Sequence, residues 1–184
     1  MRYDPNIHKR RSIRLPGYDY SQAGYYFVTI CCYQRQCLFG DIVDGAMQLN
    51  QYGVIVRDEW MRSSVIRQEI ELDEYVVMPN HFHGIVIINP VGANVNVRAN
   101  RRSPLRQPSM KPRSLSSLMA GFKSSVTKKI NLIRNTPGTK IWQRNYYEHI
   151  IRDRQSCDKI RQYIVNNPIS WENDQLHPDC PSKW

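Results

Sequence analysis

Two histidines separated by one residue are the feature of the sequence best suited to chemistry. His81, Phe82 and His83 are followed by Gly84–Ile88, an apolar and β-branched run typical of a buried strand. Side chains at positions i and i+2 of a strand point to the same face, so both imidazoles project together and Phe82 enters the opposite side. Two adjacent neutral imidazoles can bind one divalent metal ion. The alternative is a hydrogen-bonded pair on a sheet surface, which this short pattern alone favours. The buried strand strengthens the case for a metal site but leaves the alternative open.

A tyrosine and an asparagine lie one turn apart in the last predicted helix. At about 100° per residue, Tyr163 and Asn167 are about 40° apart, on a stripe beside Ile160 and Ile164. A phenol and an amide carbonyl at the edge of a buried face can reach a common site. Spacing alone leaves an alternative open, in which Tyr163 is an ordinary residue of an amphipathic helix and Asn167 caps the helix end.

These residues must be positioned by an α+β domain. Aromatic and β-branched composition predicts strands over 25–33, 70–78, 82–88 and 141–151. Helical spacing of apolar residues predicts helices over 49–66 with Asn50 as N-cap, from Ser114 through Ile130, and from Asp153 or Ser156 to Pro168. The region around Gly40, Asp44 and Gly45 is interpreted as a turn. The order β-α-β-β-α-β plus a helix predicts a ferredoxin-like split βαβ fold, with a four- to five-stranded antiparallel sheet and helices on one face.

Composition divides the 184 residues into one domain with flanking segments. Residues 1–23 form a basic N-terminal arm, residues 24–168 the domain, and residues 169–184 a polar C-terminal tail. Within the domain, residues 89–113 are rich in Asn, Gly, Arg, Pro and Ser and are predicted to form a long basic loop. Too little chain follows this loop for a second core.

Charge is strongly polarised along the chain. Lys plus Arg number 26 against 16 Asp plus Glu, a net charge of +10, and no acidic residue occurs between Glu74 and Glu148. That interval holds twelve basic residues, and Lys9–Arg14 form a second basic cluster. This polarisation indicates a polyanionic partner. The predicted DNA-binding residues are Arg98, Arg101, Arg102, Arg106, Lys111, Arg113, Lys123, Lys128 and Lys129.

Several classes of protein are disfavoured by composition. No apolar run approaches the roughly 20 residues that cross a bilayer, and the N-terminus lacks the apolar core of a secretory signal. The five cysteines include no CxxC pair, which disfavours a disulfide framework or structural zinc. We therefore expect a soluble, cytoplasmic protein without a membrane partner.

Three separated segments resemble one protein family. YVVMPNHFHG at 75–84, followed by an apolar strand, resembles the histidine-hydrophobic-histidine (HUH) motif of single-tyrosine transposases. IWQRNYYEHIIR at 141–152 and YIVNNP at 163–168 resemble the branch of REP-associated tyrosine transposases. The resemblance runs from about residue 24 to residue 171, with the motifs in the right order and spacing.

This resemblance implies metal-dependent cleavage and transfer of single-stranded or hairpin DNA through a covalent 5′-phosphotyrosine. His81 and His83 would bind Mg²⁺ or Mn²⁺, Tyr163 would be the nucleophile, and Asn167 would supply a third, oxygen ligand. Related transposases often have Gln at the position of Asn167. His149 matches a recurrent histidine of the branch, for which a structural hydrogen bond is the default role.

Other functions remain open from the sequence. A nucleic-acid-binding protein could keep this scaffold without cutting, although all four catalytic positions are present here. A replication- or plasmid-type nickase uses the same chemistry but is usually longer or carries a helicase region. An RNA-binding ferredoxin-like domain would show an aromatic ribonucleoprotein signature, which is missing. The family includes monomers and homodimers with exchanged tyrosine helices, so the oligomeric state is also open.

Overall fold

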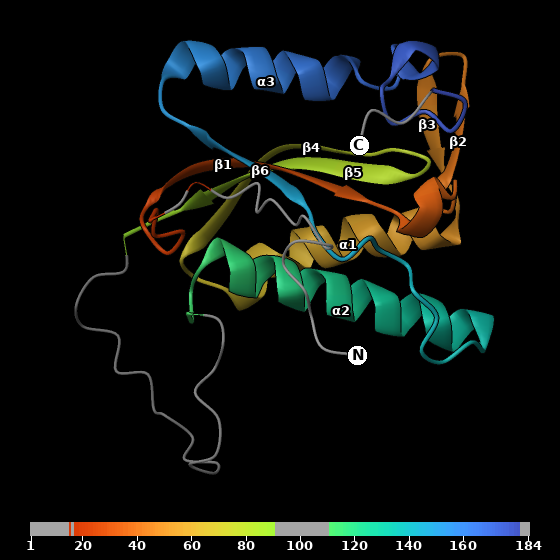
Figure 1. The fold of residues 1–184 in the computed structure, drawn as a ribbon, viewed down its shortest axis with the longest axis horizontal. Coiled ribbons are helices and arrows are strands. Elements are labelled where there is room, and N and C mark those ends of the chain that lie inside the picture. The colour runs from red at the N-terminus through yellow and green to blue at the C-terminus, as the bar shows by residue number, and fades with distance from the viewer. Residues whose placement is uncertain (1–14, 16, 91–110, 181–184) are drawn as a thin grey trace, which may run out of the picture.

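The fold is built around one four-stranded antiparallel sheet. The computed structural model describes residues 15, 17–90 and 111–180 (Figure 1). The sheet has the order β4-β5-β1-β6, and a separate two-stranded sheet pairs β2 with β3. The strands are β1 (Gly24–Cys31), β2 (Gly40–Val43), β3 (Ala46–Leu49), β4 (Ile70–Val77), β5 (His81–Ile88) and β6 (Tyr147–Ile151). The helices are α1 (Gln51–Ile66), α2 (Leu115–Arg134) and α3 (Arg154–Asn166), with 3-10 turns at Tyr33–Arg35 and Trp171–Asn173.

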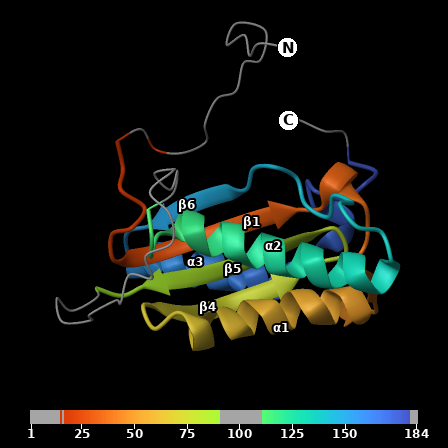
Figure 2. The same cartoon turned by 90° about the horizontal axis from the view of Figure 1, so that it is seen from below.

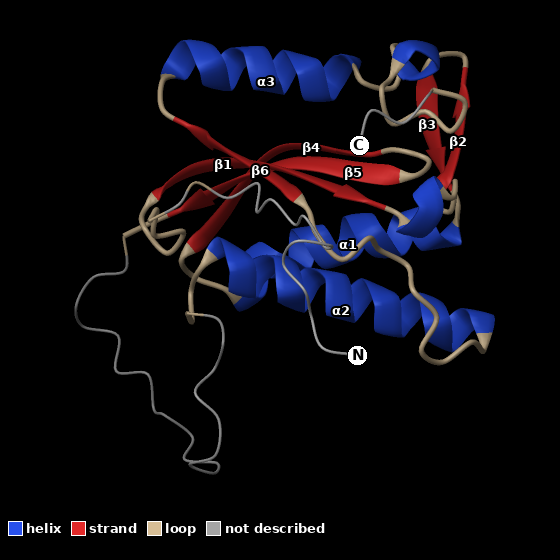
Figure 3. Ribbon diagram, in the orientation of Figure 1, coloured by secondary structure: helices blue, strands red, loops and turns tan. Residues whose placement is uncertain are grey.

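The helices cover both faces of the sheet. The α+β class and the split βαβ strand order are confirmed, with four strands in the main sheet. The expectation that all helices share one face holds for α1 and α2, whereas α3 lies on the opposite face (Figures 1 and 3). Figure 2 shows α1 and α2 side by side across the near face, with α3 behind the sheet. The physical reason is that both faces of β1 and β5 are apolar and must be covered.

Alternation along β1 and β5 divides the core in two. Val28 and Phe82 belong to the large cluster under α1 and α2, which also contains Trp60. Phe27 and Ile85 belong to the smaller cluster under α3. The residues of β5 on the face covered by α3 are therefore His81, His83, Ile85 and Ile87.

Two predictions of local structure, one turn and one strand, differ from the structure. The predicted turn around Gly40 is the β2–β3 hairpin, whose two-residue loop places Asp44 and Gly45 at φ of 50° and 72°. That conformation favours Asp-Gly, but four-residue strands at the surface leave little alternating pattern to detect. Of the predicted strand at 141–151, only Tyr147–Ile151 is one; before it, Trp142 makes an isolated bridge with Cys32.

Each of the three α-helices begins directly after a residue whose side chain caps it. The Asn50 side chain accepts hydrogen bonds from the backbone of Tyr52 and Gly53, Ser114 forms a capping box with Ser117, and Asp153 caps α3. Capping satisfies backbone N–H groups that have no partner inside the helix. Among the residues that the structure describes, no helix combines the length and apolar character needed to cross a bilayer.

Replacing Gly53 by alanine is expected to destabilise the protein by about 1–3 kcal/mol. A Cβ atom at Gly53 would lie 2.2 Å from the carbonyl oxygen of Phe39, so α1 would have to move away from the backbone that leads into β2. Urea unfolding followed by circular dichroism measures the change. Gly121→Ala in α2 is the matched control, since a Cβ atom there would meet no other atom within 4 Å and alanine favours a helix interior. Equal stability of the two variants would contradict the close approach.

Candidate active site

The two histidines of β5 lie buried on the face of the sheet covered by α3. His81 is 0% and His83 2% exposed, and their ring centroids are 4.5 Å apart. Phe82 points the other way and packs on Trp60, with 4.7 Å between ring centroids. The strand alternation expected from the sequence is thus present, and it places two imidazoles together in a water-poor environment.

The imidazoles are oriented by neighbours on their Nδ1 side. Asn80 donates its amide nitrogen to the carbonyl oxygens of Leu176 (2.7 Å) and Arg35 (3.3 Å), so its Oδ1 faces His81 Nδ1 at 2.8 Å. His81 Nδ1 must therefore carry the proton, which leaves a lone pair on Nε2. His83 Nδ1 contacts the Thr29 hydroxyl at 2.8 Å. Partners of this kind fix the tautomer and direction of histidines that bind metals.

The tyrosine of α3 reaches this pair. The Tyr163 hydroxyl lies 3.2 Å from His83 Nε2, and its ring packs edge-on against Phe27. Burial raises the pKa of Tyr163 to about 12, and the negative charge of Asp174 acts in the same direction. The phenol is therefore protonated at neutral pH. The side chain remains 47% exposed, so it is accessible from solvent.

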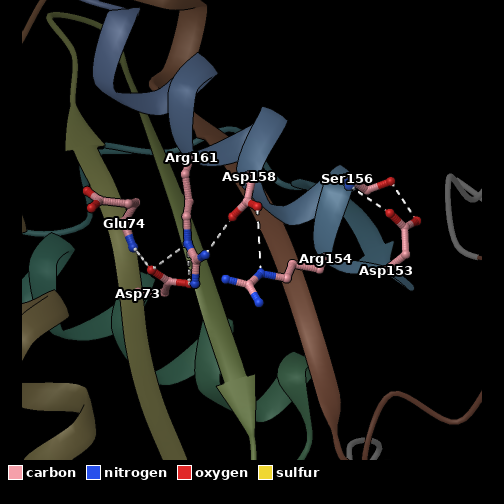
Figure 4. A network of polar contacts seen from close by, with 7 residues as sticks. All are labelled: Asp73, Glu74, Asp153, Arg154, Ser156, Asp158 and Arg161. Atoms are coloured by element: carbon pink, nitrogen blue, oxygen red, sulfur yellow. Dashed lines mark hydrogen bonds and ion pairs between the residues drawn. The ribbon is translucent and has the colours of Figure 1, made fainter.

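An ion-pair network ties α3 to the sheet. Arg161 contacts Asp73 of β4 through two guanidinium nitrogens, the shortest distance being 2.7 Å, and donates a further bond of 2.9 Å to Asp158 (Figure 4). Asp73 lies where the pairing of β4 with β5 is irregular, between Leu72 and Tyr75. Bidentate arginine–carboxylate pairs fix geometry as well as contributing energy. This contact holds the helix that carries Tyr163 over the sheet.

Two oxygen-bearing side chains complete the site. Asn167 is 2% exposed, and its Nδ2 donates to Asp174 Oδ2 at 3.2 Å. The ligand atoms of Asp174, His81 and His83 all lie within 4.8 Å of one another. Sequence reasoning missed Asp174 because it falls in the polar segment after the last motif. The one available signal was Trp171, an aromatic residue that folds the segment back: it is 7% exposed and lies 6.0 Å from the His81 ring.

The electrostatics of the site suit a cation. Burial lowers the pKa of His81 to about 4, against an opposing effect of Asp174, and burial lowers the pKa of His83 well below its usual value. Both imidazoles are therefore neutral, as metal ligands must be. Within the described part of the chain, His81 Nε2 and Asn167 Oδ1 are buried without a hydrogen-bond partner, an unfavourable state that a cation would relieve. The residues present fit a divalent metal.

The predicted DNA-binding residues are dispersed. Arg98, Arg101, Arg102 and Arg106 lie outside the described residues. Lys111 pairs with Asp19 at 2.8 Å, and Arg113 adopts a left-handed conformation just before α2. Both lie at the end of the sheet remote from the histidines, because Leu115 bonds to Tyr20 close to the start of β1, whereas His81 pairs with Cys31 at its end.

The three lysines of α2 differ in their surroundings. Lys123 donates to the carbonyl oxygens of Gln143 (2.6 Å) and Arg144 (3.0 Å), and burial lowers its pKa to about 8. Lys129 forms an ion pair with Glu59 of α1. Lys128 is exposed and has no carboxylate partner among the described residues. Lys123 therefore has a structural role and Lys129 is held in an ion pair, whereas Lys128 is exposed and available to a binding partner.

His149 lies on the exposed edge strand, away from the buried pair. It is opposite Phe27 in the register of β6 with β1, so it shares the face of the sheet that carries the histidines. Tyr147 is two residues earlier on the same face and is 44% exposed. No hydrogen bond to the His149 side chain is present among the described residues, so the default structural role finds no support there.

Fold and site together define an antiparallel α+β domain with a buried histidine pair facing a helical tyrosine. No family model matches the chain. It is 43% identical over 179 residues to an uncharacterized protein of Haemophilus influenzae, covering 97% of this chain and 98% of that one. The chain therefore belongs to the same family as the Haemophilus influenzae protein. Its fold is similar to that of a solved REP-associated tyrosine transposase bound to a REP hairpin, with a TM-score of 0.58, 21% identity, and coverage of 86% of this chain and 74% of that one.

Proposed function

We propose that the protein cleaves single-stranded DNA next to a hairpin and transfers the strand through a 5′-phosphotyrosine at Tyr163. One observation carries this proposal: the Tyr163 hydroxyl lies 3.2 Å from Nε2 of a buried, neutral histidine that shares its site with a second histidine and an aspartate. The shared fold with the REP-associated tyrosine transposase supports it. A histidine pair that only packed in the core would not require a tyrosine hydroxyl and an aspartate next to it.

The proposed metal ligands are His81, His83 and Asp174, with Asn167 as a further oxygen donor. A bound divalent cation would supply positive charge next to the scissile phosphate and its leaving oxygen. Imidazole nitrogens suit Mn²⁺ better than Mg²⁺, which prefers an all-oxygen shell, so Mn²⁺ is the favoured ion of the two. Asn80 holds His81 in the tautomer that presents the Nε2 lone pair to the site, and the Thr29 hydroxyl orients the His83 ring through Nδ1.

The reaction of Tyr163 balances without an external energy source. Its phenolic oxygen forms a bond to phosphorus, the bond from phosphorus to the 3′-oxygen breaks, and the proton lost by the phenol is matched by the one gained by the 3′-hydroxyl. The phosphodiester energy is kept in the phosphotyrosine, so a 3′-hydroxyl can attack the same phosphorus and join a new end. We propose that the tyrosine and the histidines of one chain act together, since the Tyr163 hydroxyl lies 3.2 Å from His83 Nε2 of the same chain.

A non-cleaving nucleic-acid-binding protein is the alternative, favoured by the charge of +10 alone. The deciding experiment incubates labelled hairpin oligonucleotides, each with an unpaired 5′ and 3′ flank of random sequence, with the protein and Mn²⁺ or Mg²⁺. We expect a labelled band at the mass of a protein–DNA adduct on a denaturing gel, lost when EDTA is added. Hairpin binding in a native gel without an adduct from any flank would support the alternative.

Asp174→Asn is expected to weaken Mn²⁺ binding about 10- to 100-fold, because it removes a negative charge from the ligand set. Asn167→Asp tests the neighbouring position in the opposite direction: a second carboxylate next to the same site should strengthen Mn²⁺ binding. Isothermal titration with Mn²⁺ measures both. An unchanged affinity in Asp174→Asn would leave Asn167 as the third ligand, the role implied by the sequence resemblance.

A further inference from the structure

A groove separates the second half of α2 from the segment that leads to β6. Its volume is about 790 Å³. The side that belongs to α2 runs from Lys123 to Asn135, and the other side is formed by residues 137–144. Lys123 shapes it, because its bonds to the carbonyl oxygens of Gln143 and Arg144 fix the segment next to the helix. The groove is therefore part of the folded structure.

The groove is basic and has no acidic residue in its lining. Lys128, Lys140 and Arg144 all line it, and none pairs with a carboxylate of a residue that the structure describes. The nearest contrast is Lys129, one residue along α2, which lies outside the lining and is paired with Glu59. Lys140 lies over the Tyr33 ring, 5.1 Å from its centroid, which leaves Lys128 and Arg144 as the lining cations best placed to bind a partner. Cations around a groove, with no anion in its lining to offset them, favour a polyanionic occupant.

The groove offers polar side chains to a backbone but no exposed aromatic ring to unpaired bases. Ser124, Thr127 and Asn135 are polar, and they lie beside the apolar residues Leu132, Pro137 and Ile141. The single aromatic residue of the lining is Trp142, which is 6% exposed and packed against Phe39 and Phe122, so its ring offers no face for stacking. Proteins that bind unpaired strands present exposed aromatic rings, whereas duplex DNA is contacted through its phosphates by basic and polar groups.

The groove and the candidate active site lie at the same end of the sheet. Gln143 of the groove donates its backbone N–H to the carbonyl oxygen of Cys31 at 2.9 Å, and Cys31 is the register partner of His81. In Figure 1 the end of α2, the end of β1 and the end of α3 all gather on the right. A nucleic acid held in the groove would therefore pass around the end of β1 to reach Tyr163.

We propose that this groove binds the phosphate backbone of the paired stem of a DNA hairpin, and so places its unpaired flank at Tyr163. The role that we give the groove rests on the proposed function, but the test of this proposal measures DNA binding alone. Lys128 and Arg144 contact the phosphates, and Lys123 is a positioning residue that holds the two walls together.

The test compares two variants that change the net charge equally. Lys128→Glu/Arg144→Glu alters the groove, and Arg154→Glu/Lys159→Glu alters the outer surface of α3. Fluorescence anisotropy is measured in EDTA, so that cleavage cannot occur, with a labelled hairpin and with an unpaired strand of equal length and composition. Thermal unfolding by circular dichroism establishes that both variants are folded.

We expect the groove variant to lose at least about tenfold in hairpin affinity near 0.1 M salt and about two units of slope in a plot of log affinity against log salt. The α3 variant should lose less than about threefold in hairpin affinity. The affinity for the unpaired strand should differ little between the two variants. Hairpin affinity equal in the two variants would overturn the proposal, and so would an equal loss for hairpin and unpaired strand. Because binding is measured without metal, the affinities can be interpreted even if the protein does not cleave DNA.

Discussion

Tyr163→Phe is expected to abolish formation of the covalent protein–DNA adduct, with a loss of at least about 10³-fold in rate. The substitution removes one oxygen atom, the one that lies 3.2 Å from His83 Nε2 and would bond to phosphorus. The ring that packs edge-on against Phe27 remains, so α3 should keep its place and thermal stability should change little. The measurement is a denaturing gel with labelled hairpin oligonucleotide and Mn²⁺.

Tyr147→Phe is the matched control for this experiment. Tyr147 is exposed to a similar extent, 44% against 47%, and its ring also packs edge-on against Phe27, with 6.3 Å between centroids. Losing that hydroxyl should leave adduct formation intact, because it belongs to the edge strand and does not contact the histidines. Adduct formed by Tyr163→Phe would show that another residue is the nucleophile.

The double variant His81→Ala/His83→Ala is expected to lose at least about 100-fold in Mn²⁺ affinity and to form no adduct. Each substitution removes one of the two neutral nitrogen donors, and carboxylate and amide oxygens alone are too few to hold the ion in a partly buried site. Mn²⁺ binding is measured by the electron paramagnetic resonance signal of the free ion, with circular dichroism as the check of folding.

His149→Ala serves as the control, since it removes an exposed imidazole from the same face of the sheet. It should bind Mn²⁺ like the unaltered protein. If the double variant is folded and binds Mn²⁺ with unchanged affinity, the histidine pair is not the metal site. In that case the pair is a buried structural feature, the alternative that the sequence left open.

Local rules predicted much of the fold and part of the site. Asn50, Ser114 and Asp153 signalled the helix starts because capping depends on one side chain and the next few backbone groups. The period of two along β5 placed His81 and His83 together for a similarly local reason. The face covered by α3 was not accessible in this way, because an amphipathic helix specifies that it packs but not on which side of the sheet.

The candidate site also depends on contacts that have no local pattern. Asp174 comes close to His81 only because Trp171 is buried and the 3-10 turn at Trp171–Asn173 reverses the chain. Asn80 orients His81 through a bond to the carbonyl oxygen of Leu176, which lies 96 positions away in the sequence. Such pairings are set by the packing of the whole domain. Asp174 therefore lay outside every motif, and Asn80, although it belongs to the motif at 75–84, could not be assigned its role from the sequence.

Because the histidine pair depends on residues 171–176, the proposed cleavage reaction should be lost when this segment is removed. A product of premature termination or proteolytic trimming that stops after Pro168 would retain every strand, all three helices and the basic groove. It would lack the carboxylate of Asp174, the Trp171 ring beside His81 and the carbonyl that anchors Asn80. If the protein has the proposed function, we expect such a fragment to bind hairpins without cutting them and to compete with the intact protein for DNA.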